Sequence, residues 1–526
     1  MTERKLTQGG ANVELLQLTE PKQVAAGLGA VAAALAHAGK YMRPLTALRT
    51  SLAVNQIKGF DCPGCAWPDP DAERSRVGEY CENGFKALAE EAQAETIGRE
   101  FFAEHSVAEL CNWSPMELGK AGRLAEPLYR SAGDTHYRPI SWERAFAVVA
   151  RQLRALPTPH HAVFYTSGRT SNEAAFLYQL FVRQFGTNNL PDCSNMCHES
   201  TGVALSKVLG IGKGSVTLSD FDSAQLVLVI GQNPGTNHPR MLTALERCKD
   251  RGGKVIAVNP LPEAGLMRFV NPQRPLKLLT GGTAIADLHL PVTVNGDIAL
   301  LKALMLYLLQ WDNDGQTTVD WEFIREHTLG VEAVVEDLRR HNLADLIAQC
   351  GVSADLVEQA ARMIANAQRI IICWAMGITQ HENGTENVQE IVNLLLLRGA
   401  IGKPGAGACP VRGHSNVQGD RTMGIWEKLK PDFALRLQTE FEFVPPSDDG
   451  YSAIEAVQAM HEAKVGVFFA MGGNFVGAMP DTSYVQAAMA RCDLTVSVAT
   501  KLNHSHTFCG KSARCRIMHF RPGSCG

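Results

Sequence analysis

Three cysteines near the start of the chain have the spacing of ligands for a soft metal. Cys62 and Cys65 flank a Pro-Gly turn that aims both sulfurs at one point, and Cys81 follows in the same segment. Soft thiolates select zinc or iron–sulfur clusters, and a free thiol is mostly protonated at pH 7, so the metal must supply the deprotonation. A zinc ribbon needs a second paired turn, which Cys81 does not provide. The pattern favours an iron–sulfur cluster over zinc, with unligated thiols as a third interpretation.

A second concentration of reactive side chains lies at Cys197 and His198, within the segment Ser-Asn-Met-Cys-His-Glu-Ser-Thr-Gly. This composition suits a loop that enters a helix, and a helix N-terminus lowers the pKa of a thiol. Cys197 could then be a metal-bound thiolate, with His198 as its acid–base partner. Two alternatives stay open for the pair alone: nucleophilic thiol catalysis, and a structural cysteine without chemistry.

Short apolar runs, each ending in Gly, Asn, Pro or Thr and separated by helical patterns, must position these side chains. The runs are 161–168, 225–235, 254–260, 369–377, 465–474 and 493–500. Continuous apolar runs that alternate with helices are typical of parallel sheets buried on both faces. The prediction is an α/β protein with two doubly wound units. Ligands of such sheets gather at the carboxyl ends of the strands, where these runs end.

Composition narrows the classes of function. The 526 residues include 54 acidic and 50 basic side chains, and a net charge of −4 gives no case for binding nucleic acid. No apolar leader or membrane span is found in the sequence. Fourteen cysteines in such a chain favour reduced thiols and metal ligands over disulfides, which predicts a soluble, cytoplasmic protein.

Five segments together resemble one family, the molybdopterin-guanine-dinucleotide oxidoreductases, and within it the FdhF/YdeP formate-dehydrogenase-like alpha subunits. They are the Cys62/Cys65/Cys81 loop, 166–193, the Cys197–His198 segment, 229–240 with Val-Asn-Pro and Asn-Gly-Asp further on, and 374–424. The resemblance covers roughly 59–506. It implies a formate dehydrogenase/DMSO reductase-like fold, with two doubly wound parallel-sheet units, a small N-terminal iron–sulfur segment and a missing C-terminal cap.

The resemblance also implies roles for individual residues. Cys197 takes the position of the molybdenum ligand, His198 that of the proton acceptor, and Arg412 that of the arginine that holds an anionic substrate, as a guanidinium fork can. The positions that resemble contacts to the cofactor are Gly231, Asn233, Pro234, Asn259, Pro260, Gly296, Asp297, Met376, Gly377 and Gln380.

The implied cofactors are molybdenum bis(molybdopterin guanine dinucleotide) and an iron–sulfur cluster held by Cys62, Cys65 and Cys81, either 4Fe-4S or 3Fe-4S. The implied reaction is the two-electron oxidation of formate or a similar small anionic substrate, with an electron-carrier protein as partner. The alternative is a truncated, inactive homologue that retains only the central fold.

The chain departs from the family pattern in its iron–sulfur segment. Asp69 stands where a further cysteine is usual, which leaves three thiolates, so a four-iron cluster would need a non-cysteine ligand and a three-iron cluster would not. Asn83 stands where a lysine often lies between the cluster and the pterin, and Lys86 is the nearest substitute.

The ends of the chain carry little signal. Residues 1 to about 58 show no strong motif beyond one Ala-rich helix. Residues 504–526 show no helix or strand periodicity, which is typical of out-of-frame translation or a truncation, with a genuine short tail as the alternative. The strand expected at 494–499 would then lack its next neighbour and form a sheet edge. The expected domains are 1–137 (N-terminal extension and iron–sulfur domain), 138–190 and 413–503 (first α/β pterin-binding domain), 191–412 (second such domain, with the metal-ligand loop) and 504–526 (aberrant tail).

Overall fold

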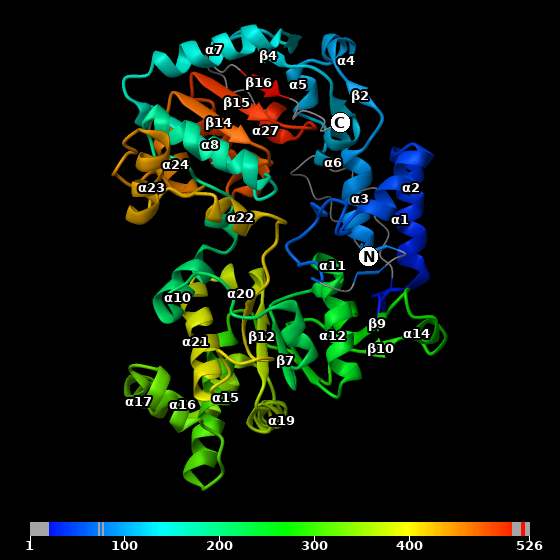
Figure 1. Cartoon of the computed structure of the whole chain (residues 1–526), viewed down its shortest axis with the longest axis vertical. Coiled ribbons are helices and arrows are strands. Elements are labelled where there is room, and N and C mark those ends of the chain that lie inside the picture. Colours follow the sequence, from blue (N-terminus) through cyan, green and yellow to red (C-terminus); the bar gives the residue numbers. More distant parts are fainter. Residues whose placement is uncertain (1–19, 72–73, 76–77, 508–516, 521–526) are drawn as a thin grey trace, which may run out of the picture.

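The computed structural model describes residues 20–71, 74–75, 78–507 and 517–520. Figure 1 shows a six-stranded sheet with its helices at one end of the molecule and a five-stranded sheet with its helices at the other. The N-terminal helices lie beside the junction of these two parts (Figure 1). The chain is therefore an α/β protein in which the two sheets and the N-terminal segment meet at one place.

The five-stranded sheet is parallel throughout. Its strands, in spatial order, are β11 (Leu288–Leu290), β8 (Lys254–Val258), β7 (Leu226–Ile230), β12 (Ile370–Trp374) and β13 (Gly407–Pro410). Because all five strands run the same way, their carboxyl ends lie along one edge of the sheet. The sequence prediction of parallel strands at 225–235, 254–260 and 369–377 is confirmed.

Both faces of this sheet are buried, which explains why its strands are apolar at every position. Leu226 and Leu228 pack in one core, while Val227 and Val229 face the other. The first core also holds α10 (Glu199–Leu209), α15 (Asp297–Asn313), α18 (Leu343–Cys350), α19 (Ala354–Ala365) and α21 (Gly384–Leu397). The second holds α12 (Met241–Asp250).

The six-stranded sheet is mixed. Its spatial order is β5 (Arg138–Pro139), β4 (Leu128–Arg130), β16 (Ile517–Phe520), β15 (Leu494–Val498), β14 (Val467–Met471) and β6 (Ala162–Thr166). The last four strands are parallel, as predicted for 161–168, 465–474 and 493–500. One face packs on α7 (Trp142–Arg154) and α8 (Asn172–Phe185), and the other on α24 (Ala453–His461), α25 (Phe475–Ala478) and α26 (Thr482–Met489).

The predicted sheet edge at 494–499 is wrong. β15 lies between β14 and β16, so Thr495 pairs with Ile517 and the strand has a neighbour on each side. Four residues are too few to show a periodicity in the sequence, but a sheet is paired through backbone groups and needs no more. The rest of the expected tail, 508–516 and 521–526, lies outside the described residues.

Residues 97–124 of the N-terminal segment pack in a core that also holds Ala499 and Leu502, and residues 34–89 form a small core of their own. Phe85 and Val54 are fully buried there, together with residues of the Ala-rich helix that the sequence predicts. The elements are β1 (Ala25–Ala26), α1 (Gly27–Tyr41), α2 (Pro44–Ala53), α3 (Glu82–Glu91), β2 (Thr96–Ile97), α4 (Arg99–Glu104), α5 (Val107–Leu110), α6 (Pro115–Lys120) and β3 (Arg123–Leu124). Cys81 caps α3, since its sulfur accepts a hydrogen bond from the Gly84 N–H.

The remaining helices and strands of the described residues complete the fold. They are α9 (Ser194–Cys197), α11 (Pro234–Asn237), α13 (Ala264–Met267), β9 (Arg268–Val270), α14 (Pro275–Leu279), β10 (Thr283–Ala284), α16 (Trp321–His327), α17 (Val331–Arg339), α20 (Met376–Thr379), α22 (Val417–Thr422), α23 (Pro431–Phe441) and α27 (His504–Thr507), with 3-10 turns at Pro159–His161 and Leu218–Asp222. None of the helices in the described ranges has the length and apolarity needed to cross a membrane.

Candidate functional site

The carboxyl edge of the five-stranded sheet gathers the residues predicted to contact a cofactor. Gly231 follows β7, Asn259 follows β8, and α20 with Gly377 follows β12. Arg412 comes two residues after β13. The parallel pairing of these strands thus brings residues from distant parts of the sequence to one edge, as expected for a ligand site of this architecture.

Gly231 and Gly377 lie backbone against backbone. The Gly377 N–H donates to the Gly231 carbonyl at 3.0 Å. A Cβ at Gly377 would lie 2.6 Å from the Gly231 Cα, and one at Gly231 would lie 2.7 Å from the Gly377 carbonyl carbon. Gly231 also has a φ of +58°, which disfavours any side chain. Both glycines are therefore needed to close the strand ends on each other, whatever else they contact.

The side chains of Asn233 and Asn259 stabilise the loops at this sheet edge through hydrogen bonds to the backbone. Asn233 caps α11, accepting from the Thr236 N–H at 3.1 Å, and Pro234 takes the first helical position. Asn259 donates to the Gln232 carbonyl at 3.0 Å, and Pro260 is exposed.

Asp297 begins α15 and is buried beside His381. The His381 Nε2 lies 3.9 Å from the Asp297 carboxylate and 2.7 Å from the Gly377 carbonyl oxygen. Burial raises the pKa of Asp297 to about 6, and His381 lowers it in part. Gly296 is buried before it, while Met376 and Gly377 are exposed at the same edge. The edge thus offers a carboxylate, amides and open backbone to a ligand.

Cys197 ends α9, directly before His198 and the start of α10. Its carbonyl oxygen accepts from the Thr379 hydroxyl at 2.7 Å and from the Gln380 side chain at 3.1 Å, which ties this loop to α20. Burial raises the pKa of the Cys197 thiol, although Arg412 and the Gly413 N–H pull it down. The predicted lowering of this pKa is wrong, because removal from water outweighs the effect of the helix start.

His198 and Arg412 surround Cys197 with buried polar atoms that lack partners. The His198 Nδ1 lies 3.2 Å from the Thr201 hydroxyl, but its Nε2 has no hydrogen-bond partner among the described residues. Arg412 donates to the His198 carbonyl at 3.3 Å and to the Gly212 carbonyl at 3.0 Å, and within the same ranges its Nε is unpaired. Burial and the Arg412 charge lower the pKa of His198 to about 3. A neutral imidazole and a cation therefore lie at the thiol.

Arg421 stabilises the loop that carries Cys197, a role that the sequence alone does not predict. Its guanidinium binds Asp192 at 2.7 Å and Glu199 at 2.9 Å, and so clamps the segment on both sides of Cys197. Arg421 lies in the long 374–424 segment, but only its partners, far away in the sequence, reveal its role. Nearby, the fully buried Asp420 has its pKa raised to about 8 by burial and by Asp192.

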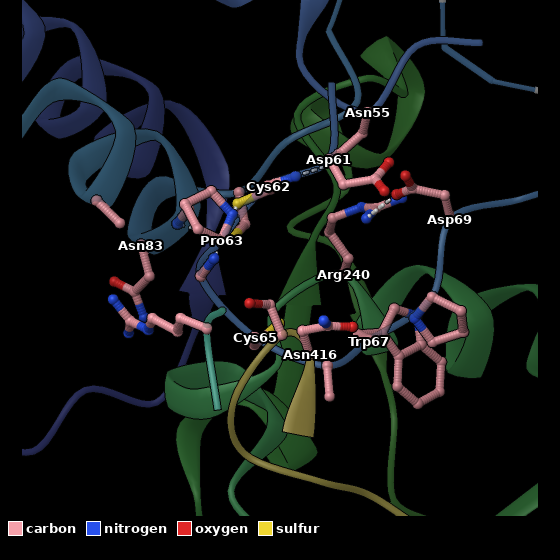
Figure 2. Close-up of a pocket in the computed structure, with 18 of the residues that line it drawn as sticks. Asn55, Asp61, Cys62, Pro63, Cys65, Trp67, Asp69, Asn83, Arg240 and Asn416 are labelled. Atoms are coloured by element: carbon pink, nitrogen blue, oxygen red, sulfur yellow. Dashed lines mark hydrogen bonds and ion pairs between the residues drawn. The ribbon is translucent and has the colours of Figure 1, made fainter. Parts of the chain in front are cut away.

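The three cysteines of the N-terminal segment line one cavity of about 920 Å³. Figure 2 shows Cys62 and Cys65 in it. A Cβ at Gly84 would lie 2.7 Å from the Cys62 sulfur and 3.5 Å from the Cys81 sulfur, so both sulfurs flank the same glycine. Burial raises the pKa of all three thiols, that of Cys62 to about 11. Across the described ranges, no group of three or more His, Cys, Asp or Glu could hold a metal ion. The thiols thus surround a space instead of converging on one point.

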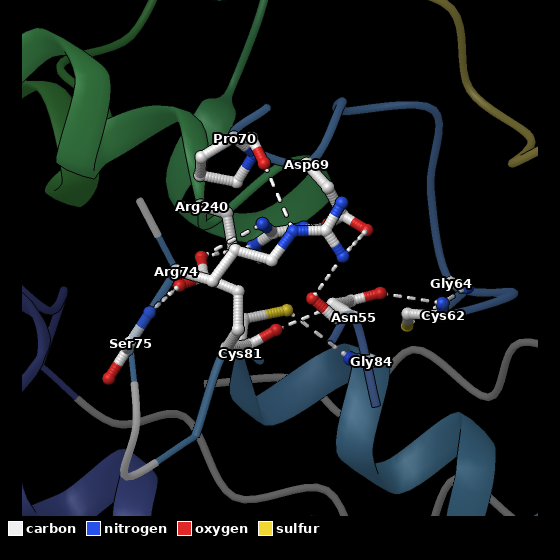
Figure 3. Close-up of polar contacts among 11 residues, drawn as sticks. Asn55, Cys62, Gly64, Asp69, Pro70, Arg74, Ser75, Cys81, Gly84 and Arg240 are labelled. Atoms are coloured by element: carbon white, nitrogen blue, oxygen red, sulfur yellow. Dashed lines mark hydrogen bonds and ion pairs between the residues drawn. The ribbon is translucent and has the colours of Figure 1, made fainter. Parts of the chain in front are cut away.

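Asn55 organises this cavity, although its surroundings in the sequence carry no motif. Its side-chain oxygen accepts from the Cys62 N–H at 2.7 Å (Figure 3). Its amide donates to the Glu79 carbonyl at 2.6 Å. Asn55 is buried and has a φ of +56°, a conformation that Asn tolerates better than most residues. It therefore joins the Cys62 turn to the chain that leads into Cys81.

Asn55→Gly is expected to destabilise the protein by about 1–3 kcal/mol, because it leaves the Cys62 N–H and the Glu79 carbonyl without their partner. Glycine keeps the positive φ, so the loss reports the side chain alone. Urea unfolding measures the change. Asn295→Gly, at an exposed position that also has a positive φ (+68°), is the control and should stay within about 0.5 kcal/mol of the wild type. Equal effects of the two changes would contradict the organising role of Asn55.

The cysteine cavity and the Cys197 site are neighbours. The Ala66 N–H, next to Cys65, donates to the Gly413 carbonyl at 3.2 Å. A Cβ at Gly413 would in turn lie 3.9 Å from the Cys197 sulfur. Asn83 donates to the Thr236 carbonyl beside α11, whereas Lys86 is paired with Glu82. The two thiol sites are thus connected through Gly413, whose carbonyl binds the Ala66 N–H and which lies beside the Cys197 sulfur.

The fold and these two sites define an α/β protein with a thiol site at the edge of a parallel sheet and a second thiol cavity beside it. Residues 123–508 match the family described as Molybdopterin oxidoreductase, and the chain belongs to that family.

The chain resembles several longer proteins of this kind. An uncharacterized oxidoreductase of Mycobacterium tuberculosis is 51% identical over 496 residues, which are 94% of this chain and 63% of the relative. Protein YdeP of Escherichia coli is 49% identical, over 86% of this chain and 60% of YdeP. The F420-dependent formate dehydrogenase 1 subunit alpha of Methanococcus maripaludis is 29% identical, over 71% and 53%. The chain thus spans less than two thirds of the length of these relatives.

Among solved structures, the acetylene hydratase of Pelobacter acetylenicus is similar to this chain. The TM-score is 0.56 at 18% identity, over 75% of this chain and 55% of the hydratase. At this identity, the likeness concerns the fold alone.

Proposed function

We propose that this chain is a molybdenum-dependent oxidoreductase that carries a bis(molybdopterin guanine dinucleotide) cofactor and oxidises formate or a similarly small anion. The observation that carries the proposal is the position of Cys197 beside His198 and Arg412 at the carboxyl edge of a parallel sheet, in a chain of the molybdopterin family. A thiol, an unpaired imidazole nitrogen and a buried guanidinium fit a site for a soft metal and an anion.

Each of these residues has a separate task in the proposal. Cys197 would bind the metal through its sulfur. When the His198 Nδ1 carries the ring hydrogen and donates to Thr201, the Nε2 can accept the proton released by the substrate. Arg412 would attract the anion, and its Nε–H is a donor not used by the described residues. When bound, molybdenum would accept the two electrons of the oxidation.

The sheet edge would hold the rest of the cofactor. Asp297, whose carboxylate lies 3.9 Å from the His381 Nε2, offers that carboxylate to hydroxyl or amino groups. Backbone around Gly231 and Gly377 can approach phosphates, because no side chain covers it. The remaining predicted contacts at this edge are Asn233, Pro234, Asn259, Pro260, Gly296, Met376 and Gln380.

We further propose an iron–sulfur cluster in the cavity of Cys62, Cys65 and Cys81, which would pass electrons to a carrier protein. Three cysteines line this one cavity, and thiolates are the ligands that iron–sulfur clusters take. Their raised pKa values mean that they need a bound metal to become thiolates. The cytoplasm is the compartment that best keeps so many thiols reduced.

Metal analysis of the anaerobically purified full chain, made in cells that produce the molybdenum cofactor, tests the proposal. Molybdenum, iron and formate-dependent reduction of a dye are expected together. Replacing Cys62, Cys65 and Cys81 by serine should remove the iron and its brown absorbance and leave the molybdenum. A chain without molybdenum would refute the proposal, and bound molybdenum without turnover of any small oxyanion would favour the inactive homologue.

A further inference from the structure

The carboxylate of Asp69 lies at the cysteine cavity, but both of its oxygens face arginines (Figure 3). The Oδ1 lies 2.5 Å from the Arg240 Nη1, and the Oδ2 lies 3.7 Å from the Arg74 Nη1. The Asp69 side chain is only 15% exposed. This carboxylate, which lines the cavity with the three thiols as Asp61 also does, is therefore already occupied by two cations.

Arg240 is held in this position from its other side. Its Nη2 and Nε donate to one oxygen of Glu79 at 2.9 and 3.3 Å, and its side chain is 13% exposed. Arg74 is fixed as well, because it donates to the Pro70 carbonyl at 3.0 Å and to the Asn55 carbonyl at 2.7 Å. Neither guanidinium is free to follow Asp69 toward the sulfurs.

Moving Asp69 onto a metal would break this arrangement. Arg240 would keep Glu79 but lose its second anion, and Arg74 would lose its contact with Asp69. Breaking ion pairs in a largely buried place is costly. Figure 2 shows the Asp69 carboxylate directed at the Arg240 guanidinium. Geometry and charge thus agree that Asp69 serves the ion pairs.

We infer that Cys62, Cys65 and Cys81 hold the metal centre of this cavity without Asp69, because Arg240 keeps the Asp69 carboxylate outside the ligand set. The inference rests on the iron–sulfur cluster of the proposed function. Three protein ligands complete a three-iron cluster, whereas a four-iron cluster would carry a non-protein ligand on one iron. Arg240 is a positioning residue in this arrangement, since it acts through Asp69.

Asp69→Asn in the full chain tests the inference. The amide keeps the shape of the side chain, and a carboxylate ligand would be lost. Iron and sulfide per chain and the EPR line shape should match the wild type, while the reduction potential of the centre rises because a negative charge has gone. Loss of iron or a new EPR signal in Asp69→Asn would overturn the inference.

Two further variants serve as controls for this test. Cys81→Ser removes a proposed ligand and should lose iron. Glu79→Gln removes the other anion bound to Arg240 and should resemble Asp69→Asn. If Asp69→Asn does not fold, wild-type protein labelled with 13C-aspartate replaces it, and electron–nuclear double resonance should detect no coupling between iron and a carboxylate carbon. Such a coupling would overturn the inference, whereas a wild type without iron would refute the proposed cluster together with it.

Discussion

Cys197→Ser is expected to lower substrate turnover by orders of magnitude while the fold stays intact. Cys197 is the one thiol that lies beside both His198 and Arg412 among the described residues, and a hydroxyl is a poor ligand for a soft metal. The backbone of the loop should persist, because Thr379 and Gln380 hold the carbonyl of Cys197 and not its side chain. Steady-state kinetics with formate, molybdenum content and circular dichroism together measure the effect.

Cys111→Ser is the matched control, because Cys111 is exposed and lies far from the sheet edge in the sequence. It should leave turnover and molybdenum unchanged. His198→Gln separates the two neighbours: molybdenum should stay bound, and turnover should fall by about 10²–10⁴-fold, the usual effect of losing one general base. If Cys197→Ser retained turnover, Cys197 would be a structural cysteine and the proposed site would be wrong.

The strands of this fold could be predicted because their apolar runs carry the information locally. The five residues of β7 are all apolar, since alternate ones face α15 and α12. This pattern predicted six strands, their parallel pairing and the sheet edges at which they end. β16 could not be predicted, because its four residues join the sheet through backbone pairing with β15 and β4.

The chemistry of the sites could be predicted only where the reactive side chains themselves are recognisable. Cys197 and the three N-terminal cysteines were found by residue type and spacing. Asn55 and Arg421 were missed, because each works by joining segments that are distant in the sequence. The pKa of Cys197 was predicted in the wrong direction, since burial depends on the whole fold and a helix start is visible locally.

The role of Arg240 at the cysteine cavity could not be predicted from the sequence either. The sequence shows Asp69 in place of a further cysteine, but it does not show what the carboxylate does. The partner of Asp69 is an arginine at the start of α12, far along the chain, and the pairing becomes visible only when the N-terminal segment is placed against the five-stranded sheet. A substitution in a metal motif is thus explained by a contact outside the motif.

Gly231 and Gly377 at the sheet edge can each be explained in two ways, by packing or by ligand binding. The family resemblance implies that Gly231 and Gly377 contact a ligand, and glycine does let backbone approach phosphates. The structure shows that each also makes room for the other, at the point where two neighbouring strands end. A glycine at a strand end can therefore serve packing, ligand approach or both, and stability measurements on the cofactor-free chain can separate them.

Gly231→Ala is expected to destabilise the cofactor-free chain by at least about 3 kcal/mol. The added Cβ would lie 2.7 Å from the Gly377 carbonyl carbon, which is backbone and cannot rotate away, and the φ of +58° strains any L side chain. Gly29→Ala is the control: it lies in α1 with no heavy atom within 4 Å of the new Cβ, and should stabilise the helix by about 0.5–1 kcal/mol. Denaturant unfolding without cofactor compares the two. An unfolding free energy of Gly231→Ala equal to that of the wild type would show that this glycine serves only the ligand.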